Sequence, residues 1–237
     1  MRMTRWSLGL AGAVVVLGGA PPRAAAQGAP NTLTAAQRKA GWELLFDGQS
    51  IDQWRGYRSD TLPSGWHVVD GVITKAGSAG DLVTRKKFGD FELDLEWKIG
   101  PAGNSGIFYR ATEEYDYIYW SGPEYQLLDD AAASDAKSRL TSAGADYAVY
   151  PSPAGFEKPA GEWNSTRIIV RGNHVEHWLN GKKLLEYELG SADWAARVKK
   201  SKFAVWPHYG VAKEGYIGIQ GDHNGELSLR NIRILPR

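Results

Sequence analysis

The stretch Asn104-Ser-Gly-Ile-Phe-Tyr-Arg110, followed after a loop by Gly122-Pro-Glu-Tyr-Gln-Leu-Leu-Asp129, decides the fold of this chain. Each segment alternates apolar and polar side chains with a period of two residues. This pattern is typical of a β-strand that has one face toward a core and the other toward water.

The alternation also predicts the direction of each side chain. The side chains expected to point inward are Ile107, Tyr109, Tyr125 and Leu127. Those expected to point outward are Phe108, Arg110, Glu124 and Gln126. If the two strands share a sheet, an arginine, a carboxylate, an amide and an aromatic ring meet on one surface, and that combination suits a sugar site.

Turn residues divide the rest of the chain into short strands. Asp70-Gly71 and Asn180-Gly181 lie between apolar segments and are signals for two-residue hairpins. About twelve strands follow one another with few helical windows, so we predict an all-β sandwich or barrel. Helices are expected over residues 34–40, capped by Thr34, and over 193–200, capped by Ser191.

The N-terminal residues read as a targeting segment. A basic start precedes an apolar run broken by glycines, and a small-x-small pattern ends at Ala26. We therefore predict a secretory signal peptide over residues 1–26 and a periplasmic or secreted protein. Residues 27–40 are expected to form a flexible leader, and residues 41–237 a single domain.

The composition argues against several classes of partner. The 28 basic and 27 acidic residues leave a net charge of +1, which gives no reason to expect binding to nucleic acid or, after signal cleavage, to a membrane. No cysteine is present, so no disulfide stabilises the fold. The ten tryptophans and eleven tyrosines can fill a sandwich core and can also stack on sugar faces.

Three carboxylates lie on one face of a predicted strand, at Glu92, Asp94 and Glu96. Paired carboxylates about 5–5.5 Å apart can perform retaining glycoside hydrolysis. The same pattern is also what a solvated sheet face would show.

Glu124 follows a loop crowded with aromatic residues, which includes Trp120. A carboxyl group that is shielded from water by rings would have a raised pKa and could exchange protons near neutral pH. The alternative is a structural ion pair between Glu124 and Arg110, and the two interpretations are compatible.

His223 lies in a tight loop at a strand end, within Gln220-Gly-Asp-His-Asn-Gly225. Asp222 could orient its imidazole ring, although the same residues also make a good turn. His174 and His177 point to opposite faces of one strand, and no metal-ligand spacing occurs, so we assign no metal ligands. An oxygen-rich site could nevertheless hold a divalent cation without a recognisable spacing.

Several segments together resemble the 3-keto-disaccharide hydrolase domain family. The similarity starts at Gly41-Trp-Glu-Leu-Leu-Phe-Asp-Gly48 and includes the two opening strands. It continues through Lys158-Pro-Ala-Gly-Glu-Trp-Asn164, Asn173–Gly181 and Gly215–Gln220, and it ends at Leu229-Arg-Asn-Ile-Arg233. The resemblance implies a concanavalin A-like jelly roll of two curved antiparallel sheets with minor short helices.

The resemblance also implies a carbohydrate substrate, a disaccharide or other glycoside bound on a concave face. Carried over by position, the catalytic candidates are Glu124, Arg110 and His223. The substrate-binding candidates are Gln126, Phe108, Trp120, Glu96, Gln220 and Asp222. One departure from the family pattern is the additional Gly221 before the Asp-His pair, which puts the placement of His223 in doubt.

Some members of this family cleave glycosides that carry a ketone at sugar carbon three. The ketone acidifies the hydrogen on carbon two, so a base can remove it and the glycosidic oxygen on carbon one can leave. Glu124 or His223 would then be the base or the acid, and Arg110 would stabilise the enolate.

Two further functions remain open at this point. The same concave face could belong to a glycan-binding module without catalysis. Alternatively, Glu96 and Glu124 could act together as a conventional two-carboxylate hydrolase.

Overall fold

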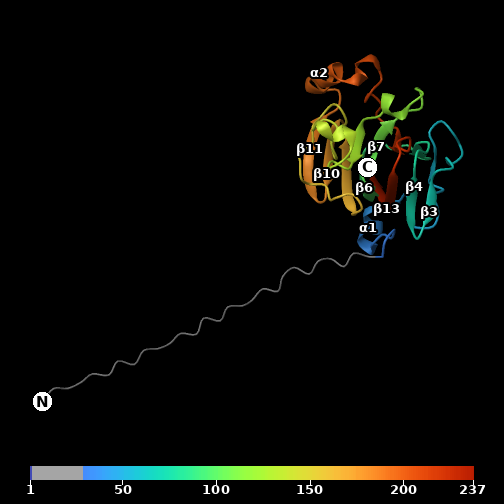
Figure 1. Cartoon of the computed structure of the whole chain (residues 1–237), viewed down its shortest axis with the longest axis vertical. Helices are drawn as coiled ribbons and strands as arrows, with labels where there is room; N and C mark the ends of the chain where they lie inside the picture. The colour runs from blue at the N-terminus through green and yellow to red at the C-terminus, as the bar shows by residue number, and fades with distance from the viewer. Residues whose placement is uncertain (2–28) are drawn as a thin grey trace.

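The computed structural model describes Met1 and residues 29–237. Apart from Met1, the predicted signal peptide lies outside the described residues. Within the described part, the strands form two antiparallel sheets packed face to face (Figure 1).

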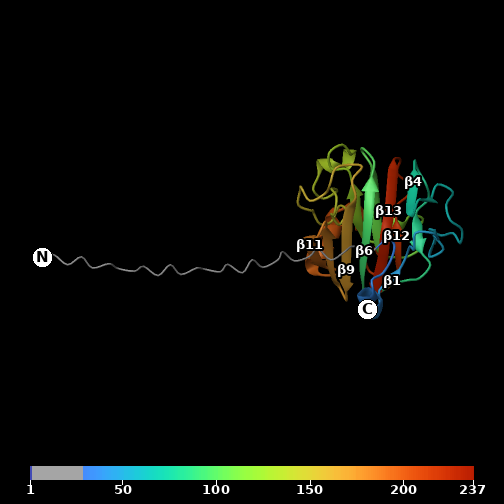
Figure 2. The same ribbon diagram turned by 90° about the horizontal axis from the view of Figure 1, so that it is seen from below.

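The larger sheet has eight strands, and Figure 2 shows most of them side by side. Their order is β11 (Lys182–Glu188), β10 (His174–Leu179), β9 (Asn164–Arg171), β6 (Phe91–Ile99), β13 (Glu226–Pro236), β4 (Val72–Ala76) and β3 (His67–Val69), with β1 (Glu43–Leu44) also paired to β13. The smaller sheet has five strands, in the order β2 (Trp54–Gly56), β5 (Leu82–Thr84), β12 (Tyr216–Ile219), β7 (Asn104–Ala111) and β8 (Glu124–Leu128).

The core lies between the two sheets. The four residues predicted to point inward from β7 and β8 are fully buried there, against residues such as Leu93, Trp97 and Ile168 of the larger sheet. Burying a large apolar side chain of this kind stabilises a fold by about 1.5–3 kcal/mol. The prediction of an all-β jelly-roll sandwich is confirmed.

The predicted turns have the expected backbone. Asp70 and Gly71 join β3 to β4 with φ angles of 50° and 74°, and Asn180 and Gly181 join β10 to β11 with 49° and 79°. Positive φ at both central residues defines the type I′ turn, whose twist matches that of paired strands. Both hairpin predictions are therefore confirmed.

Helices in residues 29–237 are few and short. The two α-helices of this part are α1 (Ala35–Ala40) and α2 (Ala192–Lys200), which lie at opposite ends of the sandwich in Figure 1. Their predicted caps are confirmed, because Thr34 accepts from the N–H of Gln37 and Ser191 from that of Trp194. The same part of the chain also contains the 3₁₀ turns η1 (Ile118–Trp120), η2 (Ser134–Lys137) and η3 (Lys202–Val205).

Candidate functional site

A cavity of about 320 Å³ lies on the outer face of the smaller sheet. Its floor comes from β7, β8 and the end of β12, and its walls come from the loops that follow. The lining residues are Asn104, Tyr119, Glu124, Gln126, Asp135, Tyr147, Lys202, Gln220, Asp222 and His223. This collection of hydroxyl, amide, carboxyl and amino groups suits a small polar ligand.

Glu124 is the most buried ionisable group in this cavity, with 3% of its surface exposed. Its strand pairs with β7 so that Glu124 faces Phe108 and Gln126 faces Gly106. The carboxyl group leans over Gly106, where a Cβ atom would lie 2.0 Å from Oε1 of Glu124. The missing side chain at position 106 therefore makes the space that the carboxyl group occupies.

Burial raises the pKa of Glu124 to about 8, against an opposing effect of the Lys202 ammonium group. Loss of water around a carboxylate disfavours its charged form. At neutral pH the carboxyl group therefore keeps its proton and can donate it. The Glu124 prediction of a shielded carboxyl group with a raised pKa agrees with this geometry.

A chain of hydrogen bonds fixes the polar floor. Gln126 donates from Nε2 to Oδ1 of Asn104 at 2.9 Å, and Asn104 donates from Nδ2 to Oδ2 of Asp135 at 3.1 Å. The Tyr147 hydroxyl donates to the same carboxylate oxygen at 3.3 Å. Asp135 and Tyr147 come from the loop after β8, so this loop is tied to the strand floor.

The loop that carries Asp222 and His223 is held from behind by residues near β4 and β5. The Gly221 N–H donates to Oδ1 of Asp81 at 2.8 Å, and the buried ammonium of Lys75 donates to the His223 carbonyl oxygen at 2.8 Å. A side chain at Gly221 would meet the carbonyl oxygen of Gly80 at 2.4 Å. The additional glycine therefore lets the loop pack closely and leaves His223 at the cavity.

One wall is aromatic and carries a cation. Nζ of Lys202, in η3, lies 4.3 Å from the centre of the Tyr147 ring and 5.3 Å from that of Tyr119. Beside it, Trp120 stacks on Trp206 with 3.9 Å between ring centres. Lys202 is therefore the cation that the cavity offers to a developing negative charge.

Five of the nine predicted site residues line this cavity, namely Glu124, Gln126, Gln220, Asp222 and His223. Trp120 and Phe108 do not line the cavity. The Trp120 ring meets the Tyr119 ring edge to face, with 5.8 Å between ring centres. Phe108 is fully buried against Val83 and Ile118, so its predicted contact with substrate is wrong.

Arg110 does not reach the cavity, and its predicted placement is wrong. On β12, Tyr216 pairs with Ala111 and Gly218 with Phe108, so β7 carries one extra residue in a β-bulge. Arg110 adopts a φ of 51° within this bulge, which breaks the alternation. Its guanidinium group donates to the Gly89 carbonyl oxygen at 3.0 Å and to Asp90 at 2.9 Å, and not to Glu124.

We therefore predict that Arg110→Met lowers the stability of the fold by about 1–3 kcal/mol, because it removes a buried hydrogen-bonded cation. The kcat of the folded protein should stay within about twofold of the wild type. Urea unfolding and steady-state kinetics check both parts. Arg58→Met, at an exposed ion pair with Asp116, is the control and should change stability little. A large loss of kcat at unchanged stability would restore a catalytic role to Arg110.

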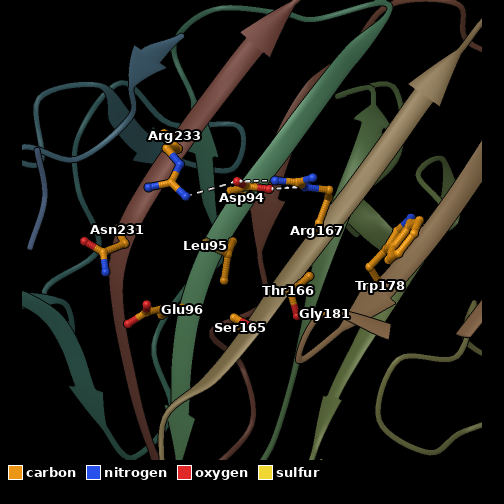
Figure 3. Close-up of a pocket in the computed structure, with 10 residues that line it drawn as sticks. All are labelled: Asp94, Leu95, Glu96, Ser165, Thr166, Arg167, Trp178, Gly181, Asn231 and Arg233. Atoms are coloured by element: carbon orange, nitrogen blue, oxygen red, sulfur yellow. Dashed lines mark hydrogen bonds and ion pairs between the residues drawn. The ribbon is translucent and has the colours of Figure 1, made fainter. Parts of the chain in front are cut away.

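Glu96 lies on the other side of the molecule, on the outer face of the larger sheet. Figure 3 shows that face, where Asp94 binds Arg167 at 2.6 Å and Arg233 at 3.1 Å. Glu96 itself pairs with Arg230 at 2.7 Å. The structure therefore holds these carboxylates in ion pairs with arginines. Glu96 does not line the cavity that contains Glu124, so the prediction that the two residues share one site is wrong.

The same placement excludes the two-carboxylate mechanism. Glu96 and Glu124 point away from the core on different sheets, with the core between them. Two groups on opposite outer faces cannot flank one glycosidic bond.

One group of side chains that could share a metal ion lies away from the cavity. Within residues 29–237, the side chains close enough to share a metal ion are His174, Glu176 and Glu186, on the outer face of the larger sheet. Lys183 already lies 2.6 Å from Glu186 there. No helix in the described part of the chain is long and apolar enough to cross a membrane.

Sequence reasoning missed Asn104, Tyr119, Asp135, Tyr147 and Lys202. Asn104 is the first residue of β7 and shares the outward parity of Phe108, so the alternation could have included it. Tyr119 lies in the same aromatic segment as Trp120. Asp135 and Lys202 lie in short 3₁₀ turns and Tyr147 lies in a loop, and no local pattern predicts the direction of side chains there.

A buried acid, a nearby cation, amides and aromatic walls in one cavity on a jelly roll define a carbohydrate-active enzyme. The chain belongs to the 3-keto-alpha-glucoside-1,2-lyase-like domain family, whose profile matches residues 41–235. It is therefore an enzyme of the glycoside hydrolase or lyase type.

Known relatives agree with this assignment. A protein named 3-keto-disaccharide hydrolase from Bacteroides thetaiotaomicron is 37% identical over 226 residues, covering 82% of this chain and 78% of the relative. A solved structure from Parabacteroides distasonis, classed provisionally as a glycosyl hydrolase, is 35% identical with a TM-score of 0.83 over 88% of this chain and 100% of its own. A Bacillus subtilis protein with a galectin-like fold, 12% identical with a TM-score of 0.50 over 88% of this chain and 94% of its own, supports the concanavalin-like fold alone.

Proposed function

We propose that this enzyme cleaves glycosides that carry a ketone at sugar carbon three, such as 3-keto-disaccharides. The observation that carries the proposal is a carboxyl group with a pKa of about 8 at Glu124, next to Lys202 and His223 in one cavity. The name of the Bacteroides relative supports the substrate class.

The reaction needs a base, an acid and a cation, and the cavity offers one of each. His223 takes the proton from carbon two, and the electron pair of that bond moves onto the ketone to form an enolate. The Lys202 ammonium stabilises the negative charge of the enolate oxygen. Asp222 lies beside this base, with its Oδ1 3.9 Å from Nε2 of His223.

The second half of the reaction breaks the glycosidic bond. The enolate electrons form the double bond between carbons one and two as the bond from carbon one to the glycosidic oxygen breaks. Glu124 donates its proton to that oxygen, so the aglycone leaves as a neutral alcohol. Water then adds to carbon one and a proton returns to carbon two, which gives the free 3-keto sugar.

The test compares a 3-keto-disaccharide with its unoxidised parent in deuterated water, with and without chelator. We expect turnover of the 3-keto substrate alone, with one deuterium at carbon two of the product. Product incubated without enzyme measures background exchange. Equal turnover of the parent sugar, or product without enzyme-dependent deuterium, would contradict the elimination mechanism.

We also propose that the enzyme acts outside the cytoplasm. The support is the pattern of charge, apolar residues and small residues over positions 1–26. Cell fractionation with antibody detection checks this location.

A further inference from the structure

The floor of the cavity contains an acceptor with no donor. Oε1 of Gln126 is buried and has no hydrogen-bond partner within residues 29–237, and the whole residue is 0% exposed. Leaving a buried carbonyl oxygen unpaired is unfavourable. In native structures such an oxygen is therefore rarely without a ligand or water molecule as its donor.

The direction of this amide is set by the residues behind it. A carboxylate oxygen accepts and does not donate, so Asp135 requires the NH₂ group of Asn104 to face it. Oδ1 of Asn104 must then face Gln126, which requires the NH₂ group of Gln126 on that side. The remaining atom, Oε1 of Gln126, is left for the ligand. Tyr147 donates to Asp135 as well and stabilises the same arrangement.

We infer that Gln126 is a specificity-determining residue, which accepts a hydrogen bond from one hydroxyl group of the sugar ring through an amide whose direction Asp135 and Asn104 set. This inference rests on the proposed function for its substrate. A ring hydroxyl can donate, whereas a deoxy carbon or an ether oxygen cannot. The site should therefore reject a sugar that lacks that hydroxyl, because the buried acceptor would remain unpaired.

The experiment is a cycle of enzyme variants and substrates. The substrates are methyl 3-keto-α-D-glucopyranoside and its 2-deoxy, 4-deoxy and 6-deoxy analogues, compared by kcat/KM. For wild-type enzyme we expect one analogue to lose about 10- to 100-fold through this contact. Gln126→Met keeps the length of the side chain and removes the acceptor. In this variant the loss of kcat/KM through the missing contact should therefore shrink to less than about threefold. The intrinsic chemical effect of each missing hydroxyl is common to both enzymes and cancels in the ratio.

Gln220→Met is the matched control. Gln220 lines the same cavity, and its Oε1 is also buried without a partner in the described residues. Its replacement should leave discrimination at the hydroxyl read by Gln126 unchanged. If Gln126→Met discriminated against each of the three analogues as strongly as the wild-type enzyme does, the inference would be overturned.

A second variant tests the relay and covers a misfolded Gln126→Met protein. Asp135→Asn keeps the shape of the side chain, but the new amide can donate as well as accept a hydrogen bond. The side-chain amides of Asn104 and Gln126 can then both reverse their direction. Discrimination at the same hydroxyl should fall severalfold, and unchanged discrimination would overturn the role of the relay.

If no 3-keto-glucoside is turned over, the proposed function fails, and the inference about Gln126 is tested separately. The same comparison is then made by calorimetry with D-glucose and its deoxy analogues, where equal affinity for all of them would overturn the inference.

Discussion

Glu124→Gln should lower kcat on a 3-keto-glucoside by about 10²- to 10⁴-fold, the range that a positioned acid or base contributes. The substitution keeps the size of the side chain and removes the proton that leaves with the aglycone. Steady-state kinetics measures the effect, and circular dichroism checks the fold. Glu214→Gln, at an exposed position away from the cavity, is the control. Full activity of Glu124→Gln would remove Glu124 from the mechanism.

The pH dependence of the same residue has a definite sign. Below about pH 8 the Glu124 carboxyl group keeps its proton and can act as an acid, so kcat should fall as pH rises through about 8. In the unfolded chain the group loses its proton near its ordinary value of 4.5. Between these pH values the folded state holds one more proton, so stability should fall as pH rises through this window.

Glu124→Gln removes both effects together. Its residual rate should lose the decline near pH 8, and its unfolding free energy should depend less on pH between about 5 and 8. Urea unfolding at several pH values provides the second measurement. A wild-type rate that stays flat to pH 9.5 would show that the protonated form is not the active one.

The core and the floor of the site follow from local alternation, which is why they could be predicted. A strand places successive side chains on opposite faces, so the buried Tyr125 and Leu127 require Glu124 and Gln126 to lie on the other face. The rule depends on an unbroken ladder. It failed at Arg110 because one extra residue in β7 changes the register there, and the sequence carries no sign of that bulge.

The remaining walls depend on long-range packing. Asp135, in η2, and Tyr147 belong to the segment after β8. This segment contacts the strand through the Tyr147 N–H, which donates to the Glu124 carbonyl oxygen at 3.0 Å. Lys202 follows α2 and lies far from β8 in sequence. Such residues meet only when the chain is folded, and a family resemblance carries over only those positions that its motifs contain.

Gly106→Ala should inactivate the enzyme although it changes no reacting group. The new methyl group would lie 2.0 Å from Oε1 and 2.7 Å from Cδ and Cγ of Glu124, so the whole end of that side chain must move. The carboxyl group is buried, and a displacement of about 1 Å in a catalytic group can reduce rates by about 10²-fold. We expect kcat to fall by at least that factor, while stability changes by less than about 1 kcal/mol because alanine suits a strand better than glycine.

The double variant Gly106→Ala/Glu124→Gln separates this explanation from a general disturbance of the sheet. If the methyl group acts by displacing the acid, adding Gly106→Ala to Glu124→Gln should reduce the residual kcat by less than about threefold, because no acid remains to be displaced. If the two losses multiply instead, the glycine serves the site in some other way. Full activity of Gly106→Ala alone would show that Glu124 can act from a different position, and the packing of its carboxyl group over Gly106 would then be irrelevant to catalysis.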